Sequence, residues 1–162
     1  MKENKKIVNA TTQKAYNISF KSKLEKRCYE LLIEAGYHPL YEGKTFTLID
    51  GFTPTKPFIS RVYNRKEKRK VFSFDRRKIL PITYTPDFTF MVKDVLVIIE
   101  CKGFENDVFP VKKKLFRRLL EEEKYPVIFY EVFALKDLKV CIEQLNRLKH
   151  DKEFKRDFLA GR

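Results

Sequence analysis

Two strand-like segments, residues 85–92 and 95–102, are separated only by Lys93 and Asp94 and limit the possible folds more than any other feature. The first segment carries Phe88, Phe90 and Val92, and the second is rich in valine and isoleucine; these residue types favour β-strands. An antiparallel hairpin closed at Lys93-Asp94 pairs Phe88 with Ile99 and gathers alternate residues on one apolar face. A register shifted by one residue would move charged side chains onto that face. The pattern therefore predicts a hairpin with one face in the core.

The opposite face of the predicted hairpin carries charge. In this register Asp87 lies across from Glu100 with the Cβ atoms about 5 Å apart, and Lys102 follows on the same side. Like charges directly opposite one another are destabilising, and a divalent cation between the carboxylates would remove the repulsion. Hard oxygen ligands suit Mg²⁺ or Mn²⁺. The structural alternative is that Asp87 caps its strand and Glu100 forms a surface ion pair with Lys102.

Two carboxylates beside a lysine match what phosphodiester hydrolysis requires. A metal ion would polarise a phosphoryl oxygen and lower the pKa of a bound water. Lys102 would orient that water or offset the charge that develops on the phosphate. The three cysteines and the two histidines, His38 and His150, lack the spacing of a zinc site, so any metal here would be held by oxygen.

The charge of the chain predicts a polyanionic partner. Lys and Arg number 35 against 22 Asp and Glu, a formal net charge of +13, and nucleic acid is the usual partner of such an excess. A protein that is merely basic on its surface is the alternative. Residues 61–78 are the most basic stretch, with a predicted turn at 64–70 between strands at 60–63 and 71–74. The candidates for DNA contact in this hairpin are Arg61, Arg65, Lys66, Lys68, Arg69 and Lys70.

A helix predicted from residue 110 or 111 to residue 123 is the second basic element. Its apolar positions, expected to face inward, are Val111, Leu115, Leu119 and Leu120. Its candidates for phosphate contact are Lys112, Lys113, Arg117 and Arg118. The alternative is a solvated face balanced by the acidic residues 121–123.

The remaining periodicity predicts one α/β domain over residues 1–162. Helices are expected at 22–35 and 135–150, and further strands at 44–49 and 127–133. This order is typical of a mixed central β-sheet flanked by helices. Residues 1–18 are expected to form a flexible arm, and the charged end 151–162 to extend the last helix or fray.

No long apolar run is present in the sequence. The longest covers residues 95–99, far short of the ~20 apolar residues of a membrane span. The first residues also lack the apolar stretch of a signal peptide. We therefore expect no membrane association, reduced cysteines and a cytoplasmic location.

Pro86-Asp87 is separated by twelve residues from Glu100-Cys101-Lys102, and this pattern resembles the PD-(D/E)xK motif of the restriction-endonuclease-like nuclease superfamily. The surrounding sequence is similar to phage endonuclease I-type resolving enzymes and to small nuclease-like proteins of phages. The resemblance implies a restriction-endonuclease-like core and Mg²⁺- or Mn²⁺-dependent cleavage of DNA. It also implies that Asp87, Glu100 and the backbone carbonyl of Cys101 bind the metal.

Glu25 matches the position from which this superfamily often takes a further acidic ligand. The same residue lies in the pattern Ser22-x-x-Glu25, a capping box in which Glu25 would accept a hydrogen bond from the Ser22 N–H. Both readings stay open. Glu42 is a further acidic candidate, with a solvated turn as its alternative.

The resulting hypothesis is a metal-dependent endodeoxyribonuclease in a bacterial or phage-infected cell. By analogy with the resembled enzymes its substrate would be branched or junction DNA, and a symmetric junction would call for a homodimer. Two alternatives remain open. One is a basic nucleic-acid-binding module that does not cut, and the other is an RNA-directed nuclease.

Overall fold

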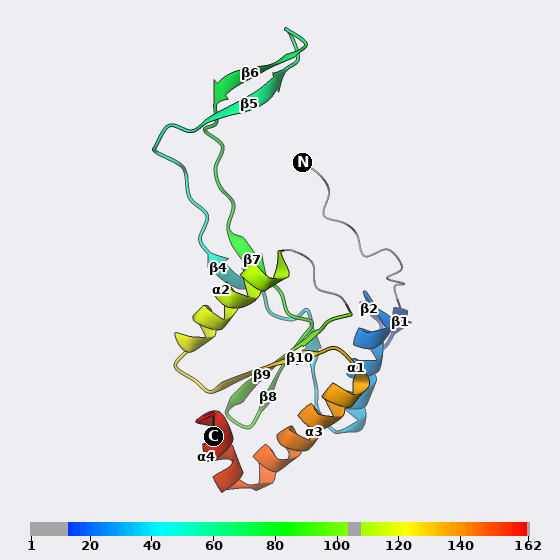
Figure 1. Ribbon diagram of the computed structural model, residues 1–162. Coiled ribbons are helices and arrows are strands. Elements are labelled where there is room, and N and C mark those ends of the chain that lie inside the picture. Colours follow the sequence, from blue (N-terminus) through cyan, green and yellow to red (C-terminus); the bar gives the residue numbers. More distant parts are fainter. Residues whose placement is uncertain (1–12, 104–107, 162) are drawn as a thin grey trace. The chain divides into compact units, whose positions relative to one another are not determined.

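The computed structural model describes residues 13–103 and 108–161, which fold into two compact units (Figure 1). The described parts of Met1–Thr45 and Thr85–Arg162 form the larger unit, and Phe46–Tyr84 forms the smaller. The fold is α/β, as predicted. That the whole chain acts as a single nuclease domain stays a prediction.

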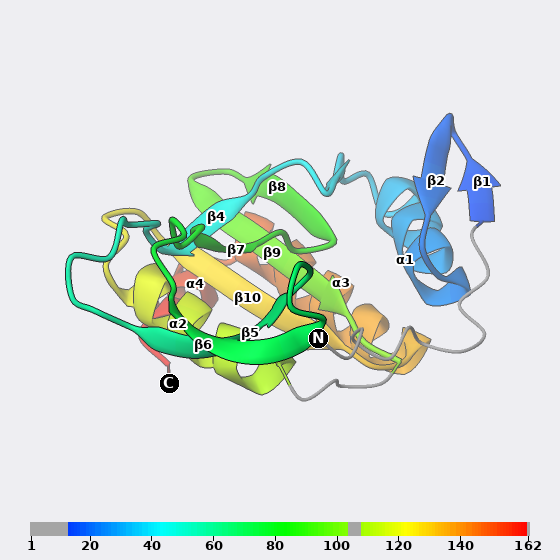
Figure 2. The same cartoon turned by 90° about the horizontal axis from the view of Figure 1, so that it is seen from above.

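A mixed four-stranded sheet lies at the centre of the larger unit, in the strand order β10-β9-β8-β3. Figure 2 shows β10, β9 and β8 side by side. The strands β8 (Phe88–Val92) and β9 (Val95–Cys101) form an antiparallel hairpin. β10 (Val127–Val132) runs parallel to β9, and the short β3 (Leu40–Tyr41) runs antiparallel to β8. The predicted mixed central sheet is therefore confirmed, with β3 as a strand that the periodicity missed.

The β8–β9 hairpin has the predicted register, with Phe88 opposite Ile99. Lys93 takes the left-handed conformation (φ 55°) that lets two residues close the turn. The ammonium of Lys93 donates to the Lys149 carbonyl, and Asp94 pairs with Lys155. These contacts hold a turn whose residue types are not the preferred ones. Residues 85–87 lie outside the ladder, so β8 is shorter than expected.

Helices cover both faces of the central sheet (Figure 1). On one face α1 (Lys23–Glu34) contacts β9, and α3 (Leu135–His150) contacts β8 and β10. On the other face α2 (Phe109–Glu121) places Phe116 edge-on to Phe129, with ring centroids 5.3 Å apart. The core on the α1/α3 face includes Phe20, Leu32, Phe88, Phe90, Val97, Ile99, Val132, Leu138 and Leu145.

The helix α1 begins and ends where the sequence predicts. The Ser22 hydroxyl accepts the Glu25 N–H at 3.1 Å, which satisfies one of the free donors at the N-terminus. Gly36, with φ 79°, follows the C-cap residue Ala35 and takes the left-handed conformation that stops the helix.

The inward face of α2 differs from the prediction. Val111 is exposed, while Phe109 and Phe116 are buried. The helix begins at Phe109, before the expected start, and its most buried positions lie seven residues apart, two turns along one face. Leu115, which is predicted to face inward, is half-buried.

The expected flexible arm is wrong for its last residues. β1 (Gln13–Ala15) and β2 (Ile18–Phe20) form an antiparallel hairpin whose turn has positive φ angles. Phe20 is fully buried in the core, which anchors the hairpin although its strands are too short to show a sequence period. Residues 1–12 of the expected arm lie outside the described residues.

The charged C-terminal end neither extends α3 nor frays. It forms a separate helix, α4 (Lys152–Leu159), because Asp151 takes an extended conformation and its carboxylate accepts the Phe154 N–H at 2.9 Å. Phe154 and Phe158 stack with ring centroids 5.2 Å apart and pack against a cluster that includes Val95.

The smaller unit contains two antiparallel strand pairs. β4 (Phe46–Ile49) pairs with β7 (Ile82–Tyr84), which the sequence analysis missed. β5 (Ile59–Asn64) pairs with β6 (Arg69–Phe74) around an exposed turn, as predicted. We call β5, β6 and their turn the basic ribbon.

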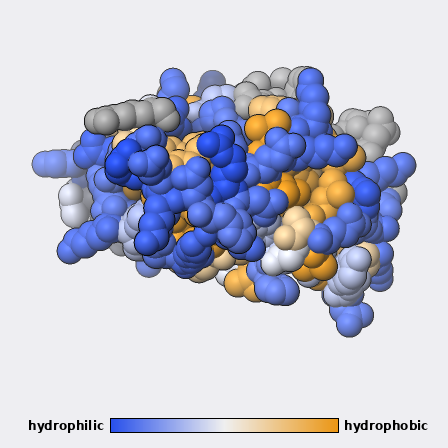
Figure 3. Space-filling model, turned by 90° about the horizontal axis from the view of Figure 1, so that it is seen from below, coloured by the Kyte–Doolittle hydropathy of each residue, from blue (hydrophilic) through white to orange (hydrophobic). Residues whose placement is uncertain are grey.

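No helix in the described parts of the chain has the length and apolar character needed to cross a membrane. On the face drawn in Figure 3, hydrophilic residues cover most of the surface and hydrophobic residues gather in patches between them. A cytoplasmic location stays a prediction.

Candidate functional site

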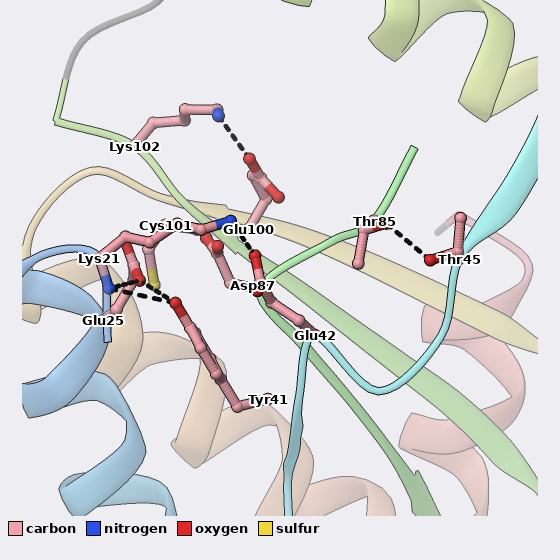
Figure 4. A network of polar contacts seen from close by, with 10 residues as sticks. All are labelled: Lys21, Glu25, Tyr41, Glu42, Thr45, Thr85, Asp87, Glu100, Cys101 and Lys102. Carbon is pink, nitrogen blue, oxygen red and sulfur yellow. Dashed lines mark hydrogen bonds and ion pairs between the residues drawn. The ribbon is translucent and has the colours of Figure 1, made fainter. Parts of the chain in front are cut away.

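Buried carboxylates meet where β8 begins and β9 ends (Figure 4). Asp87 directly precedes β8, and Glu100 is the second-last residue of β9. Their exposed fractions are 9% and 4%. Asp87 Oδ2 accepts the Cys101 backbone N–H at 2.7 Å, which ties one acidic side chain to the strand that carries the other. The structure thus brings together the two carboxylates that the hairpin register predicted.

The proximity of the two carboxylates has an electrostatic consequence. Burial raises the pKa of Asp87 to about 8, and the negative charge of Glu100 contributes in the same direction. The hydrogen bond from Cys101 and the positive charge of Lys102 oppose this shift only in part. In the absence of a cation, Asp87 therefore favours its protonated form near neutral pH.

Lys102 supplies positive charge at the same place. Its Nζ lies 2.5 Å from Glu100 Oε1 and 4.1 Å from the centre of the Phe109 ring. Its backbone N–H donates to the Val132 carbonyl at 2.8 Å, which fixes the end of β9 against β10. The structural alternative expects this pair on the surface. The ion pair is present, but it does not lie on the surface, because the Glu100 side chain is only 5% exposed.

Glu25 is held as part of a helix cap and also lies near the acidic pair. Its Oε2 accepts the Lys21 backbone N–H at 2.9 Å, where the capping-box prediction names the Ser22 N–H. The Glu25 side chain therefore accepts from the backbone one residue earlier than predicted. The negative charge of Glu25 also raises the pKa of Asp87. A role of Glu25 as a metal ligand stays a prediction.

Tyr41 and Lys21 belong to this network and were missed by sequence reasoning. The Tyr41 hydroxyl donates to Glu25 Oε2 at 2.6 Å, and both burial and this bond raise the pKa of Tyr41. The Lys21 ammonium pairs with Glu42, whose backbone N–H donates to the Asp87 carbonyl at 2.8 Å. Glu42 is thus engaged in an ion pair. The available signal is the sequence Tyr41-Glu42-Gly43, a turn between β3 and β4.

The oxygen atoms of the acidic cluster are candidate ligands for a metal ion. Among residues 13–103 and 108–161, no group of three or more histidine, cysteine or acidic side chains is arranged to hold one. Asp87 and Glu100 offer two carboxylates. Mg²⁺ is usually bound through one or two carboxylates, with waters and substrate phosphates completing its shell. The donors fit a hard cation of this kind, while Cys28, Cys101 and Cys141 are buried free thiols.

The basic residues of α2 divide into two groups. Lys113 Nζ binds Glu131 at 2.9 Å, and Glu131 is the register partner of Glu100 on β10. Lys113 is therefore held close to the acidic pair. Arg118 instead pairs with Glu122 at 2.8 Å along its own helix, as in a solvated face. Lys112 is half-buried and Arg117 is exposed.

The basic residues predicted for DNA contact lie in the smaller unit. All six side chains named in the prediction are exposed: Arg61, Arg65, Lys66, Lys68, Arg69 and Lys70. Arg69 pairs with Glu67 at 2.7 Å. The ribbon therefore presents its positive charge to solvent, as a phosphate-contacting surface requires.

Compared with protein-family models, curated proteins and solved structures, the chain matches none. The resemblance to the PD-(D/E)xK superfamily therefore rests on the residues alone.

Proposed function

We propose that this protein is a metal-dependent endodeoxyribonuclease with a restriction-endonuclease-like core. One observation carries the proposal: Asp87 and Glu100 are buried side by side, and Lys102 is bound to Glu100. Such a pair raises the pKa of Asp87 and is unfavourable for a purely structural element. A cation between the carboxylates would relieve this cost.

Each residue of the cluster has a role in the proposed hydrolysis. Asp87, Glu100 and the Cys101 carbonyl would hold Mg²⁺ or Mn²⁺, which supplies Lewis acidity at the scissile phosphate. The Cys101 N–H orients the Asp87 carboxylate. Lys102 would exchange its bond to Glu100 for the attacking water or for a phosphate oxygen, where its charge stabilises the transition state. Glu25 would either serve as a further metal ligand or hold the N-terminus of α1 next to the metal ligands.

The substrate in this proposal is DNA, with branched or junction DNA as the preferred form. Phosphate contacts from the basic ribbon carry no sequence information, which suits recognition of a DNA shape. Cleavage of a symmetric junction would require a homodimer. Lys113, beside the acidic pair, is the residue of α2 best placed to contact a phosphate.

A second candidate function is a nucleic-acid-binding module that does not cut. It is favoured by the absence, within the described residues, of any group of three metal-binding side chains. A basic ribbon in its own compact unit would serve binding equally well without hydrolysis. The third alternative, an RNA-directed nuclease, would cleave RNA when RNA and DNA are supplied as substrates in parallel reactions.

Nicking of supercoiled plasmid tests the proposal. We expect nicking with Mg²⁺ or Mn²⁺, none with excess EDTA, and little with Ca²⁺. Asp87→Asn should not nick, whereas Asp94→Asn should nick like the wild type. Asp94 is a matched control because it lies at the other end of the same hairpin, paired with Lys155.

A panel of duplex, flap, single-stranded and four-way-junction DNA, with RNA of the same shapes, then identifies the substrate. Cleavage in EDTA would contradict metal dependence. Binding without cleavage in every metal would establish the non-catalytic module instead.

A further inference from the structure

The basic ribbon has two unlike faces. Directly opposite residues of an antiparallel pair share a face, and the register pairs Ile59 with Phe74, Arg61 with Phe72 and Tyr63 with Lys70. We call these six residues the aromatic face. The other face carries three pairs of smaller or polar side chains: Ser60 with Ser73, Val62 with Val71, and Asn64 with Arg69.

The aromatic face is exposed along its whole length. Phe72 is 75% exposed, Tyr63 60% and Phe74 58%. On the other face Ser60, Asn64 and Val71 are half-buried. Exposed aromatic rings side by side are costly in water and commonly mark a binding surface. The ribbon therefore exposes its larger apolar side chains to solvent and does not pack them into a core.

Cations accompany the exposed rings. The Arg61 guanidinium lies 6.0 Å from the centre of the Phe72 ring, and that of Arg76 lies 5.8 Å from the Phe74 ring. The acidic residues of the segment are already engaged, Glu67 with Arg69 and Asp75 with Arg77. The described chain shows no acidic partner for these cations: Arg61, Arg65, Lys66, Lys68, Lys70, Arg76 and Lys78. A polyanion would complement this charge, and an apolar protein surface would not.

We propose that the aromatic face stacks on unpaired bases, so that the ribbon binds the single-stranded segment of a DNA substrate. This inference rests on the proposed function and names the part of the substrate that the ribbon recognises. Aromatic rings interleaved with cations are the usual platform for single strands, because every base offers a π-face while the cations follow the phosphates. Tyr63, Phe72 and Phe74 are the stacking residues.

Strand spacing favours an unpaired segment over duplex. Phe72 and Phe74 are two residues apart on one strand, which places their rings about 6.8 Å apart along it. Successive bases in duplex DNA are about 3.4 Å apart, with their faces covered by their neighbours. Only a strand that is unpaired and stretched can place one base on each ring.

Fluorescence anisotropy in EDTA tests this inference without any cleavage. The probes are a 20-nucleotide single strand, a duplex of the same sequence, and a 20-nucleotide strand with abasic sites throughout its centre. The full-length wild type should bind the normal strand roughly tenfold or more tightly than the abasic strand, since each stacked base contributes on that scale. A ribbon that binds by charge alone would not distinguish these two strands, and that result would overturn the proposal.

Single substitutions locate the effect on one face. Phe72→Ala should lose about tenfold in affinity for the normal strand and little for the abasic strand or the duplex. Val62→Ala, on the opposite face of the same ribbon, is the matched control and should change none of the three affinities. Equal losses in Phe72→Ala for all three probes would overturn the proposal.

The result is independent of catalysis. If the wild type prefers the normal strand but cuts no DNA, the stacking inference stands and the nuclease proposal fails. If it cuts duplex DNA but ignores the bases of a single strand, the nuclease proposal stands and the stacking inference fails.

Discussion

The acidic cluster around Asp87 and the basic ribbon are built in opposite ways. The acidic residues lie at the ends of paired strands, between helices, where burial changes the pKa of Asp87. The ribbon holds its charges and rings on two strands with few buried side chains. Chemistry of the proposed kind needs groups fixed in a low-dielectric site. Recognition of a flexible polyanion needs exposed groups. The ribbon exposes its charged and aromatic side chains and buries few of them.

The largest expected effect is a loss of DNA cleavage without a loss of DNA binding when the acidic cluster is changed. Lys102→Ala should lower the cleavage rate at saturating DNA on the order of 10³-fold, because transition-state charge stabilisation of this kind contributes several kcal/mol. DNA affinity in EDTA should stay within about twofold. Single-turnover kinetics with a labelled substrate measures both. Wild-type cleavage by this variant would show that the cluster is not the chemical centre.

Side chains of the central sheet and of the basic ribbon should also differ in how much they contribute to the free energy of unfolding. Ile99→Ala removes a fully buried side chain of β9 and should cost about 2–5 kcal/mol of unfolding free energy. Val62→Ala on the ribbon should change it by no more than about 0.5 kcal/mol. Urea denaturation followed by circular dichroism gives both values. Equal losses would mean that the ribbon contains a core of its own.

Charge removal on the ribbon should affect binding and spare the chemistry. In the triple variant Lys66→Ala, Lys68→Ala and Arg69→Ala, affinity for duplex DNA should fall. The salt slope should flatten by about 0.9 for each phosphate that the variant no longer neutralises. Arg69 should contribute least because Glu67 already pairs with it. The cleavage rate at saturating DNA should hardly change.

An unchanged salt slope in this triple variant would make the ribbon a solvated surface. The helix α2 would then become the leading DNA-contact element, with Lys113 and Arg117 as the next residues to replace.

The last expected effect is a pH dependence of stability in EDTA, which concerns the acidic cluster alone. The folded-state pKa of Asp87 is raised from 3.8 to about 8, so between these values the folded state holds a proton that the unfolded chain has released. The stabilisation from this group is complete below pH 4 and is lost as the pH rises through 8. Relative to Asp87→Asn, the wild-type melting temperature should therefore fall as the pH rises across this range. Parallel curves for the two proteins would contradict the raised pKa.

The hairpin at the site could be predicted because its alternatives are costly. A one-residue slip would move the charged residues of one strand, either Asp87 or Glu100 and Lys102, onto the apolar face, so the register could be predicted from the sequence alone. Burial of the Glu100–Lys102 pair could not be predicted in the same way. It depends on Phe109 and on β10, whose positions local patterns do not specify.

Short and distant elements set the limits of sequence reasoning. β3 and β7 have two and three residues, too few to show alternation, and they form only because longer strands pair with them. Tyr41 reaches Glu25 across 16 residues of chain. The capping pattern placed Glu25 correctly at the start of α1, but its bond to Lys21 required the path of the chain before the helix.

Thermal melting with and without Mg²⁺ tests most directly whether the buried carboxylates form a cation site. A ligand that binds only the folded state stabilises it in proportion to the logarithm of its concentration above the dissociation constant. The wild-type melting temperature should rise steadily with Mg²⁺, while that of Asp87→Asn should rise much less and that of Asp94→Asn should follow the wild type. An equal rise in the wild type and Asp87→Asn would contradict a cation site at Asp87 and Glu100.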